Sequence, residues 1–412
     1  MIKGLNSCLD RNTFSLLSRY AGLQRIFSIT GYNQIIKRCW RDELEKYRKD
    51  HSVESLFRSI IGMHIYGMNS ADEVHGALEK NRGLRFSCEC IDGPASRSQM
   101  SRDINGMDLS MVITVFNMLK QQAKKVGVYQ HNGFSDIVEK LGELKDRPVI
   151  SIDGSFIRLS KGWFPFLKKG FCTLTGKQEF GMRINVGHCV NADATGGLTI
   201  TDANVHETNS FEQLVTQCMK ACGSTKLIFV VDKGYYDHIR FQRLYDAKIL
   251  FVTPRKKYSL NKSELFPLED KEKIVDGKRI VDGFIKLSDM KNRLRWIRVY
   301  EEGKDEPFEL LTDIMNLPAE VIILLYGERW PIEVLFKEIK QYFGLKQPIG
   351  RTLNALLFHI YSVFIAYLML QILRYQFGGK YLEMSLLKFR RELKYSDEVI
   401  KTLLSKDSSL FT

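Results

Sequence analysis

The chain has 412 residues, of which 44% are apolar and 26% are charged, and its formal net charge is +13 at pH 7. This length and composition belong to a folded protein of two or three domains and exclude a polar, disordered chain. The positive charge favours an anionic partner, with nucleic acid as the first candidate and an anionic membrane surface as the second. Residues 1–10 contain no apolar segment of the kind that a secretory signal needs, so a cytoplasmic location is expected.

Residues 1–147 are predicted to form a helical region. Apolar and charged residues recur at helical spacing within it, over 41–50, 52–64 and 107–126. After Gly93 the sequence indicates a turn and then a capped, basic helix that carries Arg97 and Arg102. These two arginines either contact DNA or belong to a solvated helix face, and the sequence leaves both interpretations open.

From Pro148 onwards the apolar residues follow the period of strands. A β-branched strand over 149–152 leads to Asp153, and a turn at Gly154 is predicted to precede a second strand. Further strands are expected over 180–189, 196–202, 226–231 and 249–253, with helices over 209–222 and 237–247. Strands and helices that alternate in this way are typical of an α/β domain, predicted here over 148–350.

Charged loops and antiparallel strands over 255–310 predict a β-rich insertion in this domain, and residues 351–412 are predicted to form a C-terminal helical region. The segment 355–373 is nearly long and apolar enough to span a bilayer. It contains His359 and Ser362 and has no companion span, so we expect a buried core helix and no membrane partner.

Three acids in the chain are candidates for one metal site. Asp153 and Asp232 each follow a buried strand, and such acids project into a site at the edge of the sheet. Glu333 lies in a helix that starts near Trp330, with Pro331 in its first turn. Three carboxylates can hold two divalent ions that activate a water or hydroxyl, and an all-oxygen shell favours Mg²⁺ or Mn²⁺.

Each acid also has an ordinary structural interpretation. Asp153 before a glycine is common in turns, Asp232 is placed to cap the next turn, and the helix with Glu333 can present a solvated charged face. The combination of all three favours the functional interpretation. No Walker-type phosphate loop and no G-x-S-x-G elbow occurs in the sequence, so ATPase and hydrolase-elbow functions have no support. No paired C-x-x-C zinc motif occurs either; Cys88 and Cys90 with His75 upstream leave a metal knuckle as an alternative to reduced, buried thiols, which are favoured.

The spacing around Glu333 adds a phosphate-binding pattern. Tyr326, Arg329, Glu333 and Lys340 are separated by three, four and seven residues, which places them near one helix face. Together with Ile150-Ser-Ile-Asp-Gly and Val231-Asp-Lys-Gly-Tyr, this pattern resembles the DDE transposases of bacterial insertion sequences, in the large IS-four-type group marked by a Tyr-Arg-Glu-Lys signature. The resemblance covers roughly 150–348 strongly and the N-terminal region weakly.

This resemblance implies a ribonuclease-H-like core with a β-rich insertion, in which Asp153, Asp232 and Glu333 bind the catalytic metals. It implies that Tyr326, Arg329 and Lys340 contact phosphates, and that Trp296 in the insertion holds a flipped base, as an insertion tryptophan does in relatives. The reaction implied is metal-dependent cut-and-paste transposition: strand cleavage at the element ends, then transfer of the 3′-hydroxyl to target DNA. The N-terminal helices would bind the terminal inverted repeats, and a homodimer would hold two ends.

One departure from the family pattern lies between the first two acids. Relatives often carry His-Asp there, whereas this chain has His206-Glu207. His206 either shapes the site or has a structural role, and the structural role is favoured. Other functions remain as alternatives: a metal-dependent nuclease or resolvase on the same fold, and a decayed or domesticated copy that binds DNA without cutting. A tyrosine recombinase using Tyr326 would need an Arg/His cluster that the sequence does not provide.

Overall fold

The computed structural model describes residues 22–39, 52–130, 136–256, 263–287 and 290–405. The helix predicted over 41–50 lies outside these residues. The chain forms two compact units, and each is described by itself. One unit contains 1–128, 159–166 and 337–412, and the other contains 129–158 and 167–336. The N-terminal and C-terminal helical regions, which the sequence divides into two, thus belong to one unit.

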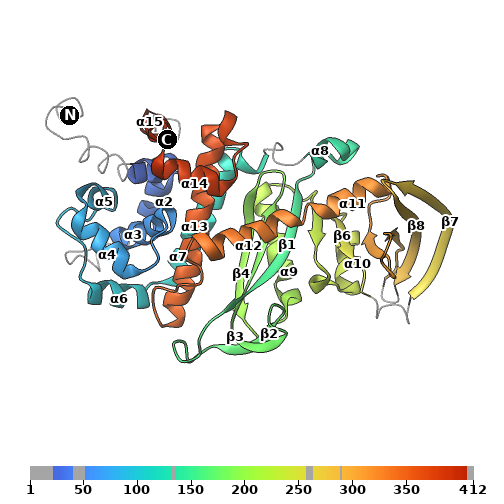
Figure 1. Ribbon diagram of the computed structural model, residues 1–412, viewed down its shortest axis with the longest axis horizontal. Helices are drawn as coiled ribbons and strands as arrows, with labels where there is room; N and C mark the ends of the chain where they lie inside the picture. Colours follow the sequence, from blue (N-terminus) through green and yellow to red (C-terminus); the bar gives the residue numbers. More distant parts are fainter. Residues whose placement is uncertain (1–21, 40–51, 131–135, 257–262, 288–289, 406–412) are drawn as a thin grey trace. The chain divides into compact units, whose positions relative to one another are not determined.

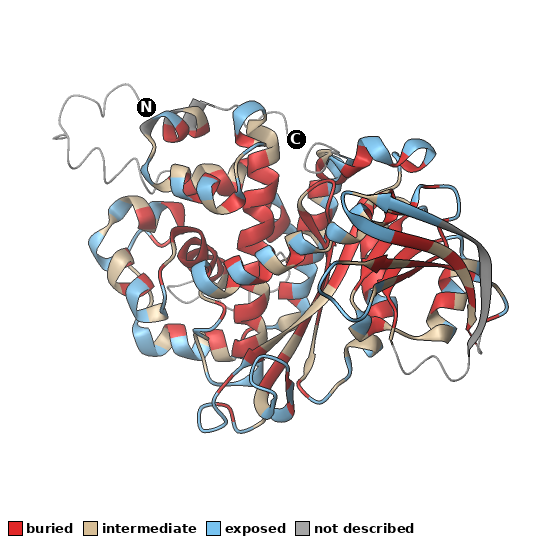
Figure 2. Cartoon of the chain, turned by 45° about the vertical axis from the view of Figure 1, so that its right-hand side comes forward, coloured by how far each residue is buried: buried red, intermediate tan, exposed pale blue. Residues whose placement is uncertain are grey.

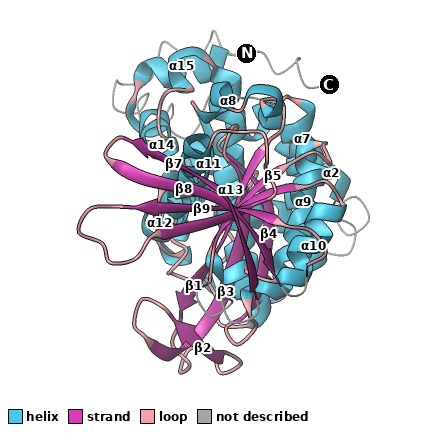
Figure 3. Ribbon diagram, turned by 90° about the vertical axis from the view of Figure 1, so that its right-hand side faces the viewer, coloured by secondary structure: helices cyan, strands magenta, loops and turns pink. Residues whose placement is uncertain are grey.

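The second unit is built on a large mixed sheet (Figures 1 and 3). Its strand order is β2-β3-β1-β5-β6-β10-β9-β8-β7, and β4 also pairs with β3. The strands are β1 (Val149–Arg158), β2 (Lys168–Cys172), β3 (Lys177–Cys189), β4 (Ala194–Asp202), β5 (Ile228–Val231), β6 (Leu250–Pro254), β7 (Ser263–Val275), β8 (Lys278–Leu287), β9 (Leu294–Tyr300) and β10 (Phe308–Thr312).

The arrangement of the central strands confirms the predicted ribonuclease-H-like α/β core. β1, β5 and β6 run parallel, and β3 and β4 continue the sheet antiparallel on the other side of β1. The segment 255–310 adds β7 to β10 as an antiparallel extension next to β6, which confirms the predicted insertion. The insertion therefore lengthens the sheet of the core and forms no separate layer.

Helices cover both faces of this sheet, and the alternation of side chains along β5 decides which helix covers which face. Phe229 of β5 contacts Phe211 of α9 (Phe211–Cys222), with ring centroids 6.2 Å apart. Val230, the next residue, belongs to the buried cluster that includes Ile322 of α11 (Ala319–Gly327). Phe251 of β6 pairs with Phe229 in register and stacks on α10 (His238–Asp246), so α9 and α10 share one face.

Three other helical segments matter for the site. The 3-10 helices η3 (Glu207–Ser210) and η4 (Lys233–Tyr235) follow β4 and β5, and α12 (Trp330–Tyr342) follows α11. Short helical segments α8 (Ile137–Lys140) and η2 (Gly142–Leu144) precede β1. The start of α12 at Trp330 agrees with the sequence prediction.

Glycine 187 in β3 is required by close packing against α9. A Cβ atom on Gly187 would lie 2.4 Å from Sγ of Cys218, and one on Gly197 would lie 3.2 Å from the same sulfur. We expect Gly187→Ala to lower the free energy of unfolding by about 1–3 kcal/mol, because an added methyl overpacks a filled core. Cys218→Ala should restore part of that loss in the double variant, measured by urea unfolding. A loss that Cys218→Ala leaves unchanged would contradict this explanation.

The predicted turn at Gly154 is wrong. β1 continues through this position to Arg158, because β3 pairs with it along the whole length, from Ile150 opposite Cys189 to Arg158 opposite Gly181. What ends near Asp153 is the parallel pairing with β5, whose last partners are Ile152 and Val231. The change from buried to half-buried residues at Asp153 marks this end of β5.

The other unit is helical. Its helices are α2 (Tyr32–Cys39), α3 (Val53–Tyr66), α4 (Ala71–Lys80), α5 (Arg82–Ser87), α6 (Arg97–Asn105), α7 (Leu109–Lys125), α13 (Leu353–Phe377), η6 (Gly379–Tyr381), α14 (Leu386–Tyr395) and α15 (Asp397–Ser405). α13 packs against α3, α6, α7 and α14, and Figure 2 shows that most of it is buried.

By length and composition, α13 is the one helix among the described residues that could cross a membrane, and 89% of its most apolar window is buried inside the protein. Its polar side chains have protein partners: Oγ of Ser362 lies 3.0 Å from Nε2 of His64, and Nε2 of His359 lies 3.1 Å from the Gly344 carbonyl. Burial and internal hydrogen bonds are what a core helix needs.

Candidate active site

Asp153 and Asp232 lie at the same edge of the sheet. Because the parallel strands β1 and β5 pair as far as Ile152 and Val231, the next residue on each strand is one of the two acids. The Gly154 amide donates to Oδ1 of Asp153 at 2.7 Å, and the Gly234 amide donates to Oδ2 of Asp232 at 3.4 Å. Backbone amides thus orient both carboxylates.

Arg329 joins the third acid to the first. Its Nη1 lies 3.1 Å from Oδ2 of Asp153, and its Nη2 forms an ion pair with Oε1 of Glu333, one helical turn further along the chain. The carbonyl of Arg329 also accepts a hydrogen bond from Ser151 of β1 at 3.5 Å. One planar guanidinium therefore joins the start of α12 to β1, at two of the acids predicted from the sequence.

The ion pairs of Arg329 with Asp153 and Glu333 occupy carboxylates that a metal ion would need. Among the described residues, no group of three or more His, Cys, Asp or Glu side chains is arranged to hold a metal ion as it stands. The nearby donors are carboxylate oxygens, the ligands that Mg²⁺ and Mn²⁺ prefer. The donor chemistry fits such an ion, and Arg329 has to release Asp153 or Glu333 before both can bind it.

Tyr326 and Lys340 flank Arg329 and Glu333 in the chain. Tyr326 ends α11, where its ring lies 5.4 Å from that of Phe308 and the guanidinium carbon of Arg329 lies 5.9 Å from its centroid. Burial raises the pKa of the Tyr326 phenol, so the hydroxyl keeps its proton at neutral pH. Lys340 is seven residues after Glu333 in the same helix and therefore on the same helix face.

A fourth carboxylate belongs to this region, and the sequence analysis gave it no role. Glu207 starts η3, and Nη1 of Arg183 donates to its Oε1 at 2.5 Å. A Cβ on Gly154 would lie 3.0 Å from the Glu207 carboxyl carbon, and one on Gly234 would lie 2.7 Å from its Oε2. The sequence signal for Glu207 is its place next to His206, where relatives often carry an aspartate.

His206 itself caps η3 rather than facing the acids. Its ring nitrogen Nδ1 accepts from the Thr208 amide at 3.3 Å and lies 2.9 Å from the Thr208 hydroxyl, and the side chain is exposed. These contacts agree with the structural role favoured from the sequence.

Asp153 has an unusual proton affinity. Burial, and next the charge of Asp232, raise the pKa of its carboxyl to about 7, although the Gly154 amide and Arg329 act in the opposite direction. A carboxylate that is held this close to other acids gains most from a nearby cation. The region is therefore prepared to bind positive charge.

The transposase DDE domain model matches residues 144–369, which is more than half of the chain. The chain belongs to this family. The match begins just before β1 and includes all three acids, so the DDE domain accounts for the whole mixed sheet and its insertion.

Similar proteins also carry transposase names. The chain is 29% identical over 204 residues to a putative transposase, y4zB, of Sinorhizobium fredii, covering 47% of this chain and 53% of the relative. It is 22% identical over 235 residues to a probable transposase for insertion sequence element IS5377 of Geobacillus stearothermophilus, covering 55% and 56%. The chain thus spans about half the length of these curated relatives.

Trp296 of the DDE domain's insertion is surrounded by charged groups. It is 8% exposed, and its indole nitrogen donates to Oε2 of Glu309 at 2.9 Å. The guanidinium carbons of Arg255 and Arg298 lie 4.7 and 4.2 Å from the ring centroid. A ring packed in this way has to lose a cation before it can stack on a base, so its base-holding role stays a prediction.

Arg255 is a further cation of the DDE domain and directly follows β6. Its Nη1 donates to Oε2 of Glu309 at 2.9 Å, and its side chain is 1% exposed. Glu309 accepts from both Arg255 and Trp296, so this acid joins the two residues.

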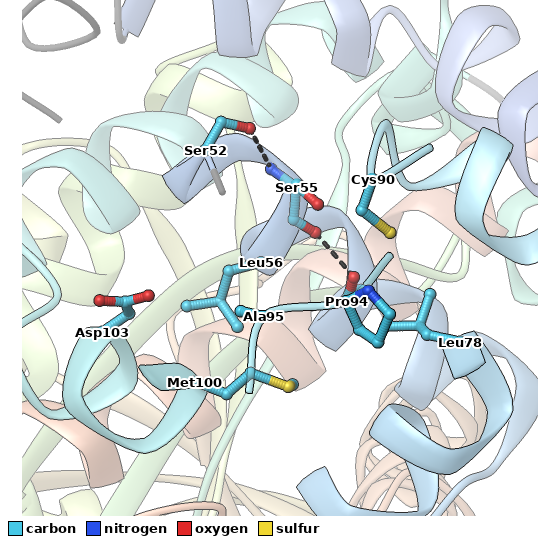
Figure 4. A pocket seen from close by; sticks show the side chains of 10 residues that line it. Ser52, Ser55, Leu56, Leu78, Cys90, Pro94, Ala95, Met100 and Asp103 are labelled. Atoms are coloured by element: carbon cyan, nitrogen blue, oxygen red, sulfur yellow. Dashed lines mark hydrogen bonds between the residues drawn. The ribbon is translucent and has the colours of Figure 1, made fainter. Parts of the chain in front are cut away.

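A small hollow in the helical unit offers no comparable chemistry (Figure 4). It is lined by hydroxyl, thiol and apolar side chains around Ser55, Met100 and Cys90. Its one carboxylate, Asp103, accepts from Gln99 at 2.6 Å, and burial raises the pKa of the Cys90 thiol. A protonated thiol is a poor nucleophile, so the acids of the DDE domain remain the candidate site.

The raised pKa of Asp153 predicts a pH effect on stability. In the unfolded chain an aspartate has a pKa of about 3.9. Between about pH 4 and pH 7 the unfolded chain loses this proton while the folded protein keeps it, so stability falls as pH rises, by at most about 4 kcal/mol. Below that window both states are protonated and the effect vanishes. Asp153→Asn should lose this contribution to the slope in urea unfolding with EDTA.

The matched control for this experiment is Asp313→Asn. Burial also raises the pKa of Asp313 to about 7, but this carboxylate accepts from the Phe251 amide near the start of β6, at the other end of the parallel strands. Asp313→Asn should flatten the pH dependence of stability, but Mn²⁺ should change the stability of this variant as much as that of the native protein. A wild-type slope retained in Asp153→Asn would contradict the assignment.

Proposed function

We propose that this protein is a DNA transposase that cleaves strands at the ends of a mobile element and transfers the freed 3′-hydroxyl to target DNA. The observation that carries the proposal is the junction of Asp153, Asp232 and Glu333, made by two adjacent strand ends and one arginine, within a DDE domain. The transposase names of the relatives support it.

In this proposal Asp153, Asp232 and Glu333 hold Mg²⁺ or Mn²⁺. The bound metal supplies a more acidic water or hydroxyl and charge stabilisation for the leaving oxygen. The protein's own contribution is to fix the carboxylates: the Gly154 and Gly234 amides orient the aspartates, and Arg329 holds Glu333 near Asp153.

Phosphate binding falls to the residues of the Tyr-Arg-Glu-Lys pattern. Tyr326 keeps its phenolic proton and can donate it to a phosphate oxygen, and Arg329 and Lys340 supply positive charge. With a cation bound to the acids, Arg329 would be free to contact a phosphate instead of Asp153 and Glu333. This is the reason that we place both groups in one site.

The substrate we propose is double-stranded DNA, namely the terminal inverted repeats of the element and the target. The net charge of +13 supports such a partner. The helical region 1–147 is proposed to bind the ends, the region 148–350 to carry out catalysis, and a homodimer to hold two ends. Bacterial DNA lies in the cytoplasm, where we expect the protein to act.

The test is cleavage of labelled DNA that carries the inverted repeats flanking this gene, with Mg²⁺ or EDTA, by the native protein and Glu333→Gln. Metal-dependent cleavage and joining by the native protein alone would support a transposase. Cleavage without joining would favour a nuclease on the same fold, and binding without cleavage would favour a decayed or domesticated copy. Equal cleavage by both proteins would overturn the role of Glu333.

A further inference from the structure

Glu207 forms an ion pair with Arg183 and also lies near Asp153 and Asp232. Its side chain is 22% exposed, and its carboxylate comes from η3, which follows β4 and is separate from the elements that carry the other acids. The question is whether this carboxylate only anchors Arg183 or also takes part in the chemistry of the site.

Arg183 fixes one side of the Glu207 carboxylate. Its Nη1 donates to Oε1 of Glu207, while its Nε and Nη2 donate to the carbonyls of Ala203 at 3.1 Å and Phe171 at 3.0 Å. With three acceptors at fixed positions on this guanidinium, the glutamate is held in one orientation. The other oxygen, Oε2 of Glu207, lies beside Gly234.

Two glycines lie beside the Glu207 carboxylate. Gly154 directly follows Asp153, and a Cβ there would lie 2.7 Å from Oδ1 of Asn185 and 3.0 Å from the Glu207 carboxyl carbon. Gly234 is two residues after Asp232, and a Cβ there would lie 2.7 Å from Oε2 of Glu207 and 3.7 Å from Oδ2 of Asp232. The Glu207 carboxylate thus lies against the backbone that follows both aspartates.

We propose that Glu207 is a fourth carboxylate of the divalent-cation site, oriented by Arg183. This inference rests on the proposed function and deepens it. A partner for Arg183 alone would not need backbone without Cβ atoms beside both aspartates. Oε2 of Glu207 and Oδ2 of Asp232 both lie near the Cβ position of Gly234, so Glu207 supplies a further anionic oxygen from outside the strands, and such oxygens raise the affinity for a hard cation.

The experiment measures Mn²⁺ binding to the full-length protein without DNA, from the electron paramagnetic resonance signal of free Mn²⁺. Glu207→Gln keeps the size of the side chain and an oxygen that accepts from Arg183, but removes the charge. We expect it to weaken Mn²⁺ binding by about 10–100-fold. Glu207→Asp keeps the charge and should restore part of the affinity.

The matched control is Glu212→Gln, which removes the charge from a second acid–arginine pair five residues further along. Oε1 of Glu212 lies 2.9 Å from Nε of Arg240, and this side chain is 51% exposed. It should bind Mn²⁺ as the native protein does. If Glu207→Gln also binds Mn²⁺ like the native protein, Glu207 only pairs with Arg183 and the proposal is wrong.

A purely structural effect has a different pattern. Arg183→Gln breaks the ion pair but leaves the Glu207 charge in place. If Glu207 has only a structural role, Arg183→Gln and Glu207→Gln should both lower the melting temperature, and their Mn²⁺ affinities should be equal. Our proposal predicts the larger loss of affinity for Glu207→Gln. A loss that is equal in the two variants and follows the melting temperature would overturn it.

The readout also separates this inference from the proposed function. Mn²⁺ binding by the native protein that Asp153→Asn abolishes defines the cation site without any DNA reaction. If that site binds Mn²⁺ and depends on Glu207, but inverted-repeat DNA is not cut, the proposed function fails and this inference stands. If DNA is cut and Glu207→Gln binds Mn²⁺ as the native protein does, the proposed function stands and this inference fails.

Discussion

Asp232→Asn is expected to reduce metal-dependent strand cleavage by about 10³-fold, because a metal ligand of this kind contributes several kcal/mol to the transition state. Asp232 ends β5 at the carboxyl edge of the sheet, where it lies beside Asp153. The substitution keeps the size of the side chain and its ability to accept from the Gly234 amide. Binding of the DNA ends, measured by gel shift, should change by no more than a few-fold.

Asp237→Asn is the control for this substitution. Asp237 lies five residues further along and caps α10, with its Oδ1 accepting from the Arg240 amide at 2.8 Å. Asparagine is also a good cap, so both stability and cleavage should stay near the native values. Native cleavage rates in Asp232→Asn would show that this acid holds no catalytic metal.

Arg329→Ala is expected to reduce cleavage by about 10²–10³-fold, the effect of removing one group that stabilises charge in a transition state. The substitution also separates Asp153 from Glu333, which the guanidinium joins. Arg329 lowers the pKa of Asp153, so its loss raises that pKa further. The pH at which cleavage reaches half of its maximum should therefore move to a higher value.

Arg329→Lys distinguishes charge from geometry. Lysine keeps the positive charge but has no planar group that can contact Asp153 and Glu333 together. Compared with Arg329→Ala, we expect Arg329→Lys to bring the pH profile of cleavage closer to the native one than the cleavage rate. Arg279→Lys serves as the control, since Arg279 is half exposed over the ring of Tyr300 in the insertion. A pH profile that is unchanged in Arg329→Ala would contradict the link to Asp153.

Much of the candidate site was predictable because its signals are local. The buried run of β5 and the position of Asp232 after it are contained in a few consecutive residues. The same is true of Glu333, since helical spacing alone relates it to Arg329 and Pro331 marks the first turn of α12. The long apolar run of α13 likewise predicted a buried helix.

The turn predicted at Gly154 shows where local signals fail. An Asp-Gly pair is typical of turns, but here β3 pairs with the residues before and after it and keeps β1 extended. Glycine at this position is explained by two side chains that a Cβ would meet, Asn185 at 2.7 Å and Glu207 at 3.0 Å, which lie 31 and 53 positions away along the chain. Pairing and contacts over such separations leave no periodic trace in the sequence.

The sequence by itself determined the α/β class, the β-rich insertion, the helical regions and three candidate acids, because period, turn residues and spacing act over short distances. Only the tertiary structure decided that Arg329 joins Asp153 to Glu333, that cations cover Trp296, and that Glu207 lies beside the aspartates. These contacts depend on which strands pair and in which register, and that is set by burial of the whole sheet.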